Sequence, residues 1–99
     1  MFLDNYISQI NYLCRQNGVK TLYAFGSVLS DRFTADSDID LIIDIDSNDP
    51  IDYSEKYFNM SFGLQDLIKR PIDLLEEKTI RNKYLKAELD KTKTLIYGW

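Results

Sequence analysis

Two short apolar runs with polar ends constrain the fold of this chain more than any other feature. Leu22–Phe25 leads directly into Gly26–Ser27, and Leu41–Ile43 is preceded by Asp38 and Asp40. Each run has the length and composition of a buried strand. Only ten residues separate Ser27 from Asp38, and so short a connection favours antiparallel pairing of the two strands. Their polar ends then meet at one edge of a sheet.

The spacing of Asp38 and Asp40 indicates a metal site. Residues i and i+2 of a strand point to the same face, and carboxylates held so close repel each other unless a cation lies between them. Mg²⁺ suits such hard oxygen ligands and usually takes one or two carboxylates together with substrate phosphates. An EF-hand calcium loop could also begin at Asp36. Such a loop needs glycine at its sixth position and glutamate at its twelfth, whereas Leu41 and Ser47 stand there, so an EF-hand is excluded.

Gly26 and Ser27 are suited to binding phosphate. Gly26 has no Cβ, so a triphosphate could approach its backbone, and Ser27 adds a hydroxyl and an N–H group. A phosphate-binding turn that faces a pair of metal-binding carboxylates makes a site for nucleotidyl transfer. The alternative is that Ser27 only caps a helical turn and that Asp38 and Asp40 belong to a solvent-exposed acidic loop.

The absence of histidine narrows the chemistry further. It excludes serine–histidine and cysteine–histidine catalysis, histidine general bases and the common zinc sites. Catalysis must then depend on carboxylates, lysines or tyrosines. The single cysteine, Cys14, precludes an internal disulfide and suits a reducing cytoplasm. No apolar stretch approaches eighteen residues and the N-terminus lacks a signal pattern, so we expect a cytoplasmic protein that does not enter membranes.

Charge is unevenly distributed along the chain. The net charge of −4 argues against direct nucleic-acid binding over the whole surface. Half of the acidic residues lie within 36–55, whereas eight of the twelve basic residues lie within 69–93. The acidic part could hold a metal ion, and the basic part could bind phosphate or an acidic partner. The alternative is that the basic part is only a solvated helix of mixed charge.

The remaining sequence predicts a single domain, residues 1–99, of the α/β (α+β) class. We expect a small mixed or antiparallel sheet of three to four strands flanked by helices. The strands are expected at 21–25, 39–45, 72–75 and, at an edge, 95–97. The first helix is expected to carry Leu3, Ile7, Ile10 and Cys14 and to end at Asn17–Gly18. A short helical turn is expected at 28–32 and a long helix at 51–68, after Asp49 and Pro50. The last helix should run from the capping Asn82 to Thr92, with Tyr84, Leu85 and Leu89 facing inward.

Phe58 and Phe62 lie to one side of the apolar stripe of the long helix. They make its apolar surface wider than a small sheet needs, and exposed aromatic patches often mark interfaces. We therefore expect them to contact a partner. The alternative is that they cover the edge of the core.

The order Gly26-Ser27, ten residues, Asp38-x-Asp40 resembles the signature of the DNA polymerase beta-like nucleotidyltransferases. Over nearly its full length the chain resembles the minimal nucleotidyltransferase domains that act as antitoxins for HEPN-domain toxins. Asp73 corresponds to the family's third carboxylate, on a neighbouring strand. The resemblance implies the palm fold of polymerase beta, and Asp38, Asp40 and Asp73 as catalytic residues holding two Mg²⁺ ions, with Mn²⁺ as an alternative. It also implies that Gly26, Ser27, Arg32 and Lys93 bind ATP or another nucleoside triphosphate.

The implied reaction is transfer of AMP from ATP to a hydroxyl, with release of pyrophosphate. Such a short chain has no room for an acceptor domain, so the acceptor is expected on a partner, most simply a tyrosine of a HEPN toxin. Non-catalytic neutralisation of that partner and nucleotide sensing are the alternatives, and self-association also stays open. One feature departs from the family: the arginine, basic residue and glycine that many members carry after glycine-serine are Val28, Ser30 and Asp31 here. Arg32 or the C-terminal lysines would have to replace them.

Overall fold

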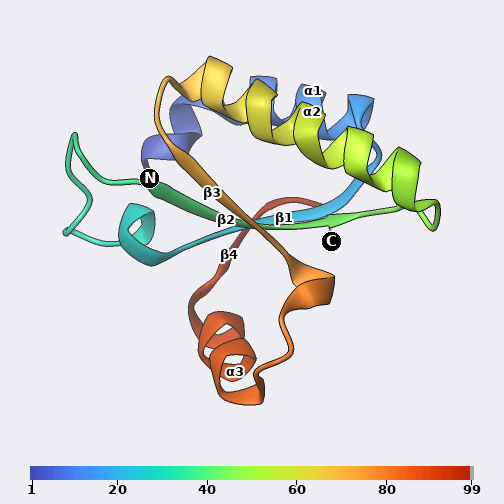
Figure 1. Ribbon diagram of the computed structural model, residues 1–99. Helices are drawn as coiled ribbons and strands as arrows, with labels where there is room; N and C mark the ends of the chain where they lie inside the picture. The colour runs from blue at the N-terminus through green and yellow to red at the C-terminus, as the bar shows by residue number, and fades with distance from the viewer. Residues whose placement is uncertain (99) are drawn as a thin grey trace.

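A four-stranded sheet in the order β3-β2-β1-β4 forms the centre of the protein (Figure 1). The computed structural model describes residues 1–98; Trp99, expected just after the last strand, lies outside this range. The elements, with η denoting a 3-10 helix, are η1 Phe2–Tyr6, α1 Ile7–Gln16, β1 Val19–Phe25, η2 Gly26–Leu29, β2 Ile39–Ile45, α2 Pro50–Ile68, β3 Ile72–Glu76, η3 Glu77–Thr79, α3 Lys83–Thr92 and β4 Thr94–Tyr97.

The pairing of the strands makes the sheet mixed. β1 pairs antiparallel with β2 and with the edge strand β4, whereas β2 pairs parallel with β3. Antiparallel pairing of β1 with β2 was expected from their short connection, and it is confirmed. The register sets Phe25 opposite Asp40 and Asp40 beside Asp73. The sheet therefore brings the first two strands' polar ends and the start of β3 to one edge, as predicted.

α1 and α2 cover one face of the sheet (Figure 1). Alternate residues of β2, including Leu41 and Ile43, are buried in one core with residues of the two helices such as Ile10, Met60 and Leu64. Because successive side chains of a strand point to opposite faces, Asp40 and Ile42 lie on the other face. The predicted carboxylate site is thus on the face away from α1 and α2.

The ends of α2 follow the local sequence. The Asp49 carboxylate accepts a hydrogen bond from the Ile51 N–H at 3.0 Å, and Pro50 occupies the first turn, where it leaves no donor unpaired. The helix ends at Lys69, which adopts the left-handed conformation with φ 62°. The predicted cap and helix bounds are confirmed. Within residues 1–98, no helix, α2 included, is long and apolar enough to cross a lipid bilayer.

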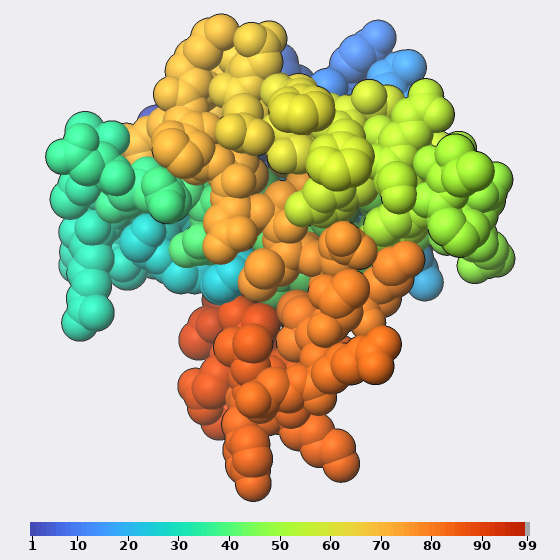
Figure 2. Space-filling view, in the orientation of Figure 1, coloured from blue at the N-terminus to red at the C-terminus, as the bar shows by residue number. Residues whose placement is uncertain are grey.

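Three predictions about the helices need correction. Tyr84 and Leu85 of α3 do not face inward: they are 87% and 48% exposed, and only Leu89 in the last turns is buried. The reason is that α3 contacts the sheet through its C-terminal end and projects from the body (Figure 2), so nothing covers its first turn. The turn expected at 28–32 forms earlier, as η2, and the first helix begins as the 3-10 helix η1.

Candidate active site

Three aspartates lie at the edge of the sheet where β2 begins. Asp40 and Asp73 are neighbours on the parallel strands β2 and β3, and Asp38 stands just before β2. Partial burial raises the pKa of the Asp40 carboxyl, and the nearby charges of Asp73 and then Asp38 raise it further. The two neighbours therefore act on Asp40 as like charges, as the spacing predicted for Asp38 and the family resemblance implied for Asp73.

Gly26 approaches Asp40 from the end of β1. Its φ is +75°, a conformation that favours glycine, and a Cβ built on it would lie 2.6 Å from Asp40 Oδ2. The Ser27 hydroxyl, in η2, donates a hydrogen bond of 3.4 Å to the carbonyl oxygen of Asp38. The glycine-serine turn is thus held against the segment that carries the carboxylates, and any side chain at position 26 would displace Asp40.

The chemistry of these donors fits a hard divalent cation. Asp38, Asp40 and Asp73 supply only carboxylate oxygens, and a bound cation would relieve the repulsion that, after burial, raises the pKa of Asp40. Within residues 1–98, no three or more His, Cys, Asp or Glu side chains form a group that could hold a metal ion as they stand. Coordination of a cation by all three aspartates stays a prediction.

Arg32 and Lys93, the two basic residues predicted to bind nucleotide, have different surroundings. Arg32 lies exposed in the turn after η2, near the glycine-serine turn in sequence. The Lys93 ammonium lies 2.9 Å from Asp90 Oδ1, 3.8 Å from Glu77 Oε1 and 4.2 Å from the centroid of the Tyr23 ring. The hydrogen bond to Asp90 raises the pKa of Lys93. Lys93 is therefore a charged group that is already paired with acidic side chains on the open face of the sheet. A phosphate would have to compete with two carboxylates for it.

Arg70 is the residue of this region whose contacts the sequence did not predict. Its guanidinium donates to the carbonyl oxygens of Ser37, at 3.1 Å, and Thr34, at 2.9 Å. These carbonyls belong to the loop that leads to Asp38. No local pattern in the sequence indicates these contacts, because Ser37 and Thr34 lie 33 and 36 residues before Arg70 in the chain.

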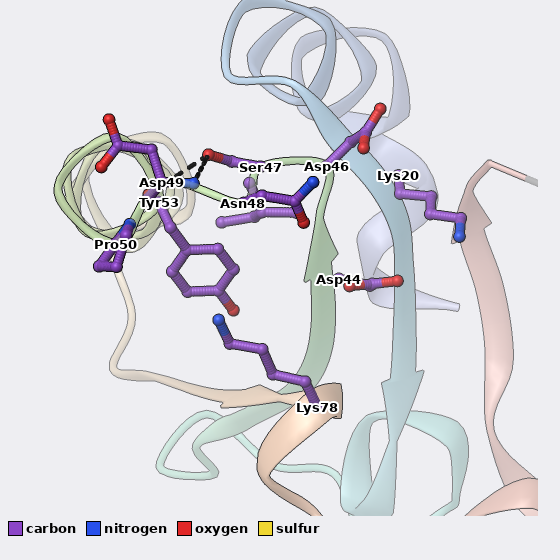
Figure 3. Close-up of a pocket in the computed structure, with 10 residues that line it drawn as sticks. Lys20, Asp44, Asp46, Ser47, Asn48, Asp49, Pro50, Tyr53 and Lys78 are labelled. Atoms are coloured by element: carbon purple, nitrogen blue, oxygen red, sulfur yellow. Dashed lines mark hydrogen bonds between the residues drawn. The ribbon is translucent and has the colours of Figure 1, made fainter.

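A hollow of about 390 Å³ lies at the opposite end of β2 (Figure 3). Its walls carry charges of both signs, among them Asp44, Asp46 and Lys20, and the Lys78 ammonium lies 3.4 Å from the centroid of the Tyr53 ring. None of the seven predicted site residues lines it. Because acids and lysines are mixed there, it lacks the convergent set of like-charged oxygens that metal binding requires. The edge of the sheet that carries Asp38, Asp40 and Asp73, called the carboxylate edge below, is more open than this hollow. Its residues, however, have the chemistry that metal binding requires.

Replacing Asp40 with asparagine is expected to stabilise the metal-free protein at neutral pH. A raised pKa means that the folded chain holds this proton more tightly than the unfolded chain. Stability from this group is therefore present below its ordinary pKa and is lost as the pH rises through its folded-state pKa. With solvent screening, we expect Asp40→Asn to melt about 1–3 °C above wild type near pH 7.5 in EDTA. A difference in Tm that does not shrink towards about pH 4.5 would contradict this electrostatic account.

A mixed sheet with carboxylates on adjacent parallel strands, facing a glycine-serine turn, defines a nucleotidyltransferase fold. The profile of the family described as "Polymerase beta, Nucleotidyltransferase" matches residues 8–98. MJ1379 of Methanocaldococcus jannaschii, a predicted protein adenylyltransferase, is 33% identical over 79 residues, which cover 80% of this chain and 76% of that protein. The chain therefore belongs to the polymerase beta nucleotidyltransferase family, and it is a nucleotidyltransferase.

Solved structures agree on the fold. A predicted minimal nucleotidyltransferase superimposes with a TM-score of 0.77 at 19% identity, over 94% of this chain and 91% of that one. A chain from the complex of a tri-AMPylated Shewanella oneidensis HEPN toxin with an MNT antitoxin superimposes with a TM-score of 0.64 at 20% identity, over 97% of this chain and 72% of that one. The predicted family and the α/β fold class are confirmed.

Proposed function

We propose that this protein transfers AMP from ATP to a tyrosine hydroxyl of a HEPN-domain partner and thereby acts as its antitoxin. The observation that carries the proposal is the position of Asp40, between Gly26 on one side and Asp73 and Asp38 on the other. Support for adenylyl transfer comes from the relative MJ1379, which is named for that activity. Support for a HEPN partner comes from the structural neighbour in which such a toxin carries AMP.

In this proposal, the glycine-serine turn binds the triphosphate beside Asp38 and Asp40. Gly26 leaves its backbone open to the phosphates, and the Ser27 hydroxyl can exchange its long hydrogen bond to Asp38 for one to a phosphate oxygen. A divalent cation held by Asp38, Asp40 and Asp73 would neutralise the charge that develops on the α-phosphate. The exposed Asp73 accepts the proton of the attacking hydroxyl.

The bonds of the reaction balance without a redox partner. The tyrosine oxygen forms a bond to the α-phosphorus of ATP while the bond from that phosphorus to the bridging oxygen of pyrophosphate breaks. The products are tyrosyl-AMP, pyrophosphate and the proton held by Asp73. An open carboxylate edge is consistent with an acceptor that arrives on another protein, because that protein can complete the walls of the site and exclude water.

The outer side of α2 is the proposed surface for the partner. Phe58 and Phe62 are 53% and 67% exposed, and their rings stack with centroids 6.2 Å apart. Tyr57 packs edge-on against Phe58, and its hydroxyl donates to the carbonyl of Leu74 in β3 at 2.7 Å. The aromatic pair is therefore fixed to the sheet and presents a rigid apolar surface to a partner.

The double variant Phe58→Asp, Phe62→Asp is expected to fold normally and to lose the partner. Both rings lie largely in solvent, so their loss costs little core packing, whereas two carboxylates in the centre of an interface would remain unpaired. Co-purification with the protein encoded beside it, the proposed HEPN partner, is expected to fall at least about tenfold. Tyr12→Asp, on the exposed side of α1, is the matched control. Undiminished co-purification of the double variant would remove α2 from the interface.

The proposed activity is tested by mass spectrometry of the partner after incubation with ATP and Mg²⁺. We expect the HEPN protein to gain the mass of one or more AMP groups, located on a tyrosine by fragmentation. The second candidate is an antitoxin that binds without chemistry, which is favoured by the missing basic residues after Gly26–Ser27 and by the engagement of Lys93 with Asp90 and Glu77. A tight complex whose partner stays unmodified would support that candidate instead.

A further inference from the structure

Arg70 joins three segments that are distant in the sequence. Besides its two hydrogen bonds to the loop before β2, its guanidinium carbon lies 4.9 Å from the ring centroid of Phe2 and 4.4 Å from that of Phe33. The two rings also contact each other, with centroids 5.3 Å apart. The guanidinium is thus held by η1, by the loop before β2 and by its own position before β3.

The loop that Arg70 holds is a closed turn that ends at Asp38. The Ser37 N–H donates to the carbonyl of Thr34 at 3.1 Å, and the Ser37 hydroxyl accepts from the Thr34 N–H at 2.9 Å. Arg70 binds the carbonyl oxygens at both ends of this turn. Since the turn is internally bonded, fixing it at two points fixes the backbone that enters Asp38.

A second link ties the starts of the two carboxylate strands. The Ile39 N–H donates to the carbonyl of Pro71 at 3.1 Å. Arg70–Pro71 therefore holds both sides of Asp38: the turn before it through the guanidinium and the residue after it through the backbone. Asp73 follows in β3, three residues after Arg70.

We propose that Arg70 is a positioning residue that fixes Asp38 against Asp40 and Asp73, and that this arrangement makes the carboxylate edge competent for nucleotidyl transfer. The inference rests on the proposed function for its catalytic consequence, but its structural part stands on the contacts of Arg70 alone. Within residues 1–98, the Arg70 guanidinium donates only to carbonyl oxygens of the loop and contacts the two rings, so we assign it a role through Asp38 and not on the reacting atoms.

Lysine cannot replace arginine in this role. The planar guanidinium donates to two carbonyls in its plane while its faces pack on aromatic rings, whereas an ammonium is a strongly hydrated point charge without such a plane. Arg70→Lys keeps the charge, but it removes the double hydrogen bond and the stacking. The conservative substitution therefore separates positioning from electrostatics.

Hydrogen exchange of the metal-free protein tests the structural part. In Arg70→Lys, we expect the amides of Ser37 and Ile39 to exchange at least about tenfold faster, while the amides of the central residues 41–45 of β2 keep their wild-type rates. Arg81→Lys, at an exposed position between η3 and α3, is the matched control and should change neither. Phe33→Leu, which keeps Arg70 but removes one ring, should give a smaller increase at the same two amides.

Steady-state AMP transfer tests the catalytic part. Misplacement of a catalytic group by about 1 Å can cost roughly 10²-fold, so we expect Arg70→Lys to lower kcat about 10- to 100-fold. KM for ATP should change far less, because Gly26 and Ser27 are untouched. Unchanged exchange at Ser37 and Ile39, or equal acceleration over the whole sheet, would overturn the positioning role. If wild type transfers no AMP, the proposed function fails, and the exchange data still decide what Arg70 does to the loop.

Discussion

Replacing Asp40 with asparagine is expected to abolish the proposed AMP transfer, with a loss of at least about 10³-fold in kcat, while the protein remains folded. The Asp40 carboxylate lies between Gly26 and Asp73, and its pKa is raised by burial and then by the charges of Asp73 and Asp38. Asparagine fills the same space but has no negative charge, so it cannot help to hold a divalent cation. Because the same substitution relieves repulsion, activity should disappear while thermal stability rises slightly.

Asp44→Asn is the matched control for this experiment. Asp44 lies on the same strand and the same face as Asp40, four residues further along, and lines the hollow at the far end of β2. It carries the same charge but has no place in the proposed chemistry, so its transfer rate should stay within about twofold of wild type. Equal loss of activity in both variants would mean that net charge, rather than the carboxylate edge, determines the rate.

Gly26→Ala is expected to cause the second large effect. The new methyl group would lie 2.6 Å from Asp40 Oδ2 and would occupy a residue with φ of +75°. The clash displaces the Asp40 carboxylate and narrows the approach of the triphosphate, so we expect AMP transfer to fall about 10²- to 10³-fold. The left-handed conformation should cost about 1–2 kcal/mol in the free energy of unfolding.

Gly18→Ala separates this clash from backbone strain. Gly18 also has a positive φ, +62°, but a Cβ there would meet the end of the flexible Lys56 side chain, 3.2 Å away. Both variants should therefore lose similar stability in denaturant titration, and only Gly26→Ala should lose activity. If Gly18→Ala loses as much activity, the effect of Gly26→Ala arises from general destabilisation rather than from Asp40.

The parts of the fold that follow local rules could be predicted from the sequence. β2 was expected at its observed bounds, since a short apolar run rich in isoleucine between Asp40 and Asp44 favours a buried strand. The Asp49 cap and Pro50 marked the start of α2 in the same way. The carboxylate edge was also predictable, because the i, i+2 spacing and a short connection are properties of neighbouring residues.

Features that depend on distant contacts could not be predicted. The apolar residues of α3 suggested an inward face, but packing of only its last turns leaves Tyr84 87% exposed. The contact of Lys93 with Glu77, sixteen residues earlier in the chain, was not foreseen either, and its binding of phosphate stays a prediction. Arg70 bonds a carbonyl 36 residues away. No periodicity or cap in the sequence encodes such pairings.

The most direct test of the central claim, that the Asp38–Asp40 edge performs nucleotidyl transfer, uses ATP labelled separately at the α- and γ-phosphates. Wild type and the Asp38→Ala, Asp40→Ala double variant are each incubated with Mg²⁺ and the protein encoded beside this chain, the proposed partner. Adenylyl transfer predicts label on the partner from α-labelled ATP only, and only with wild type. Label from the γ-position, or α-label that survives in the double variant, would contradict the assignment of the reaction to these carboxylates.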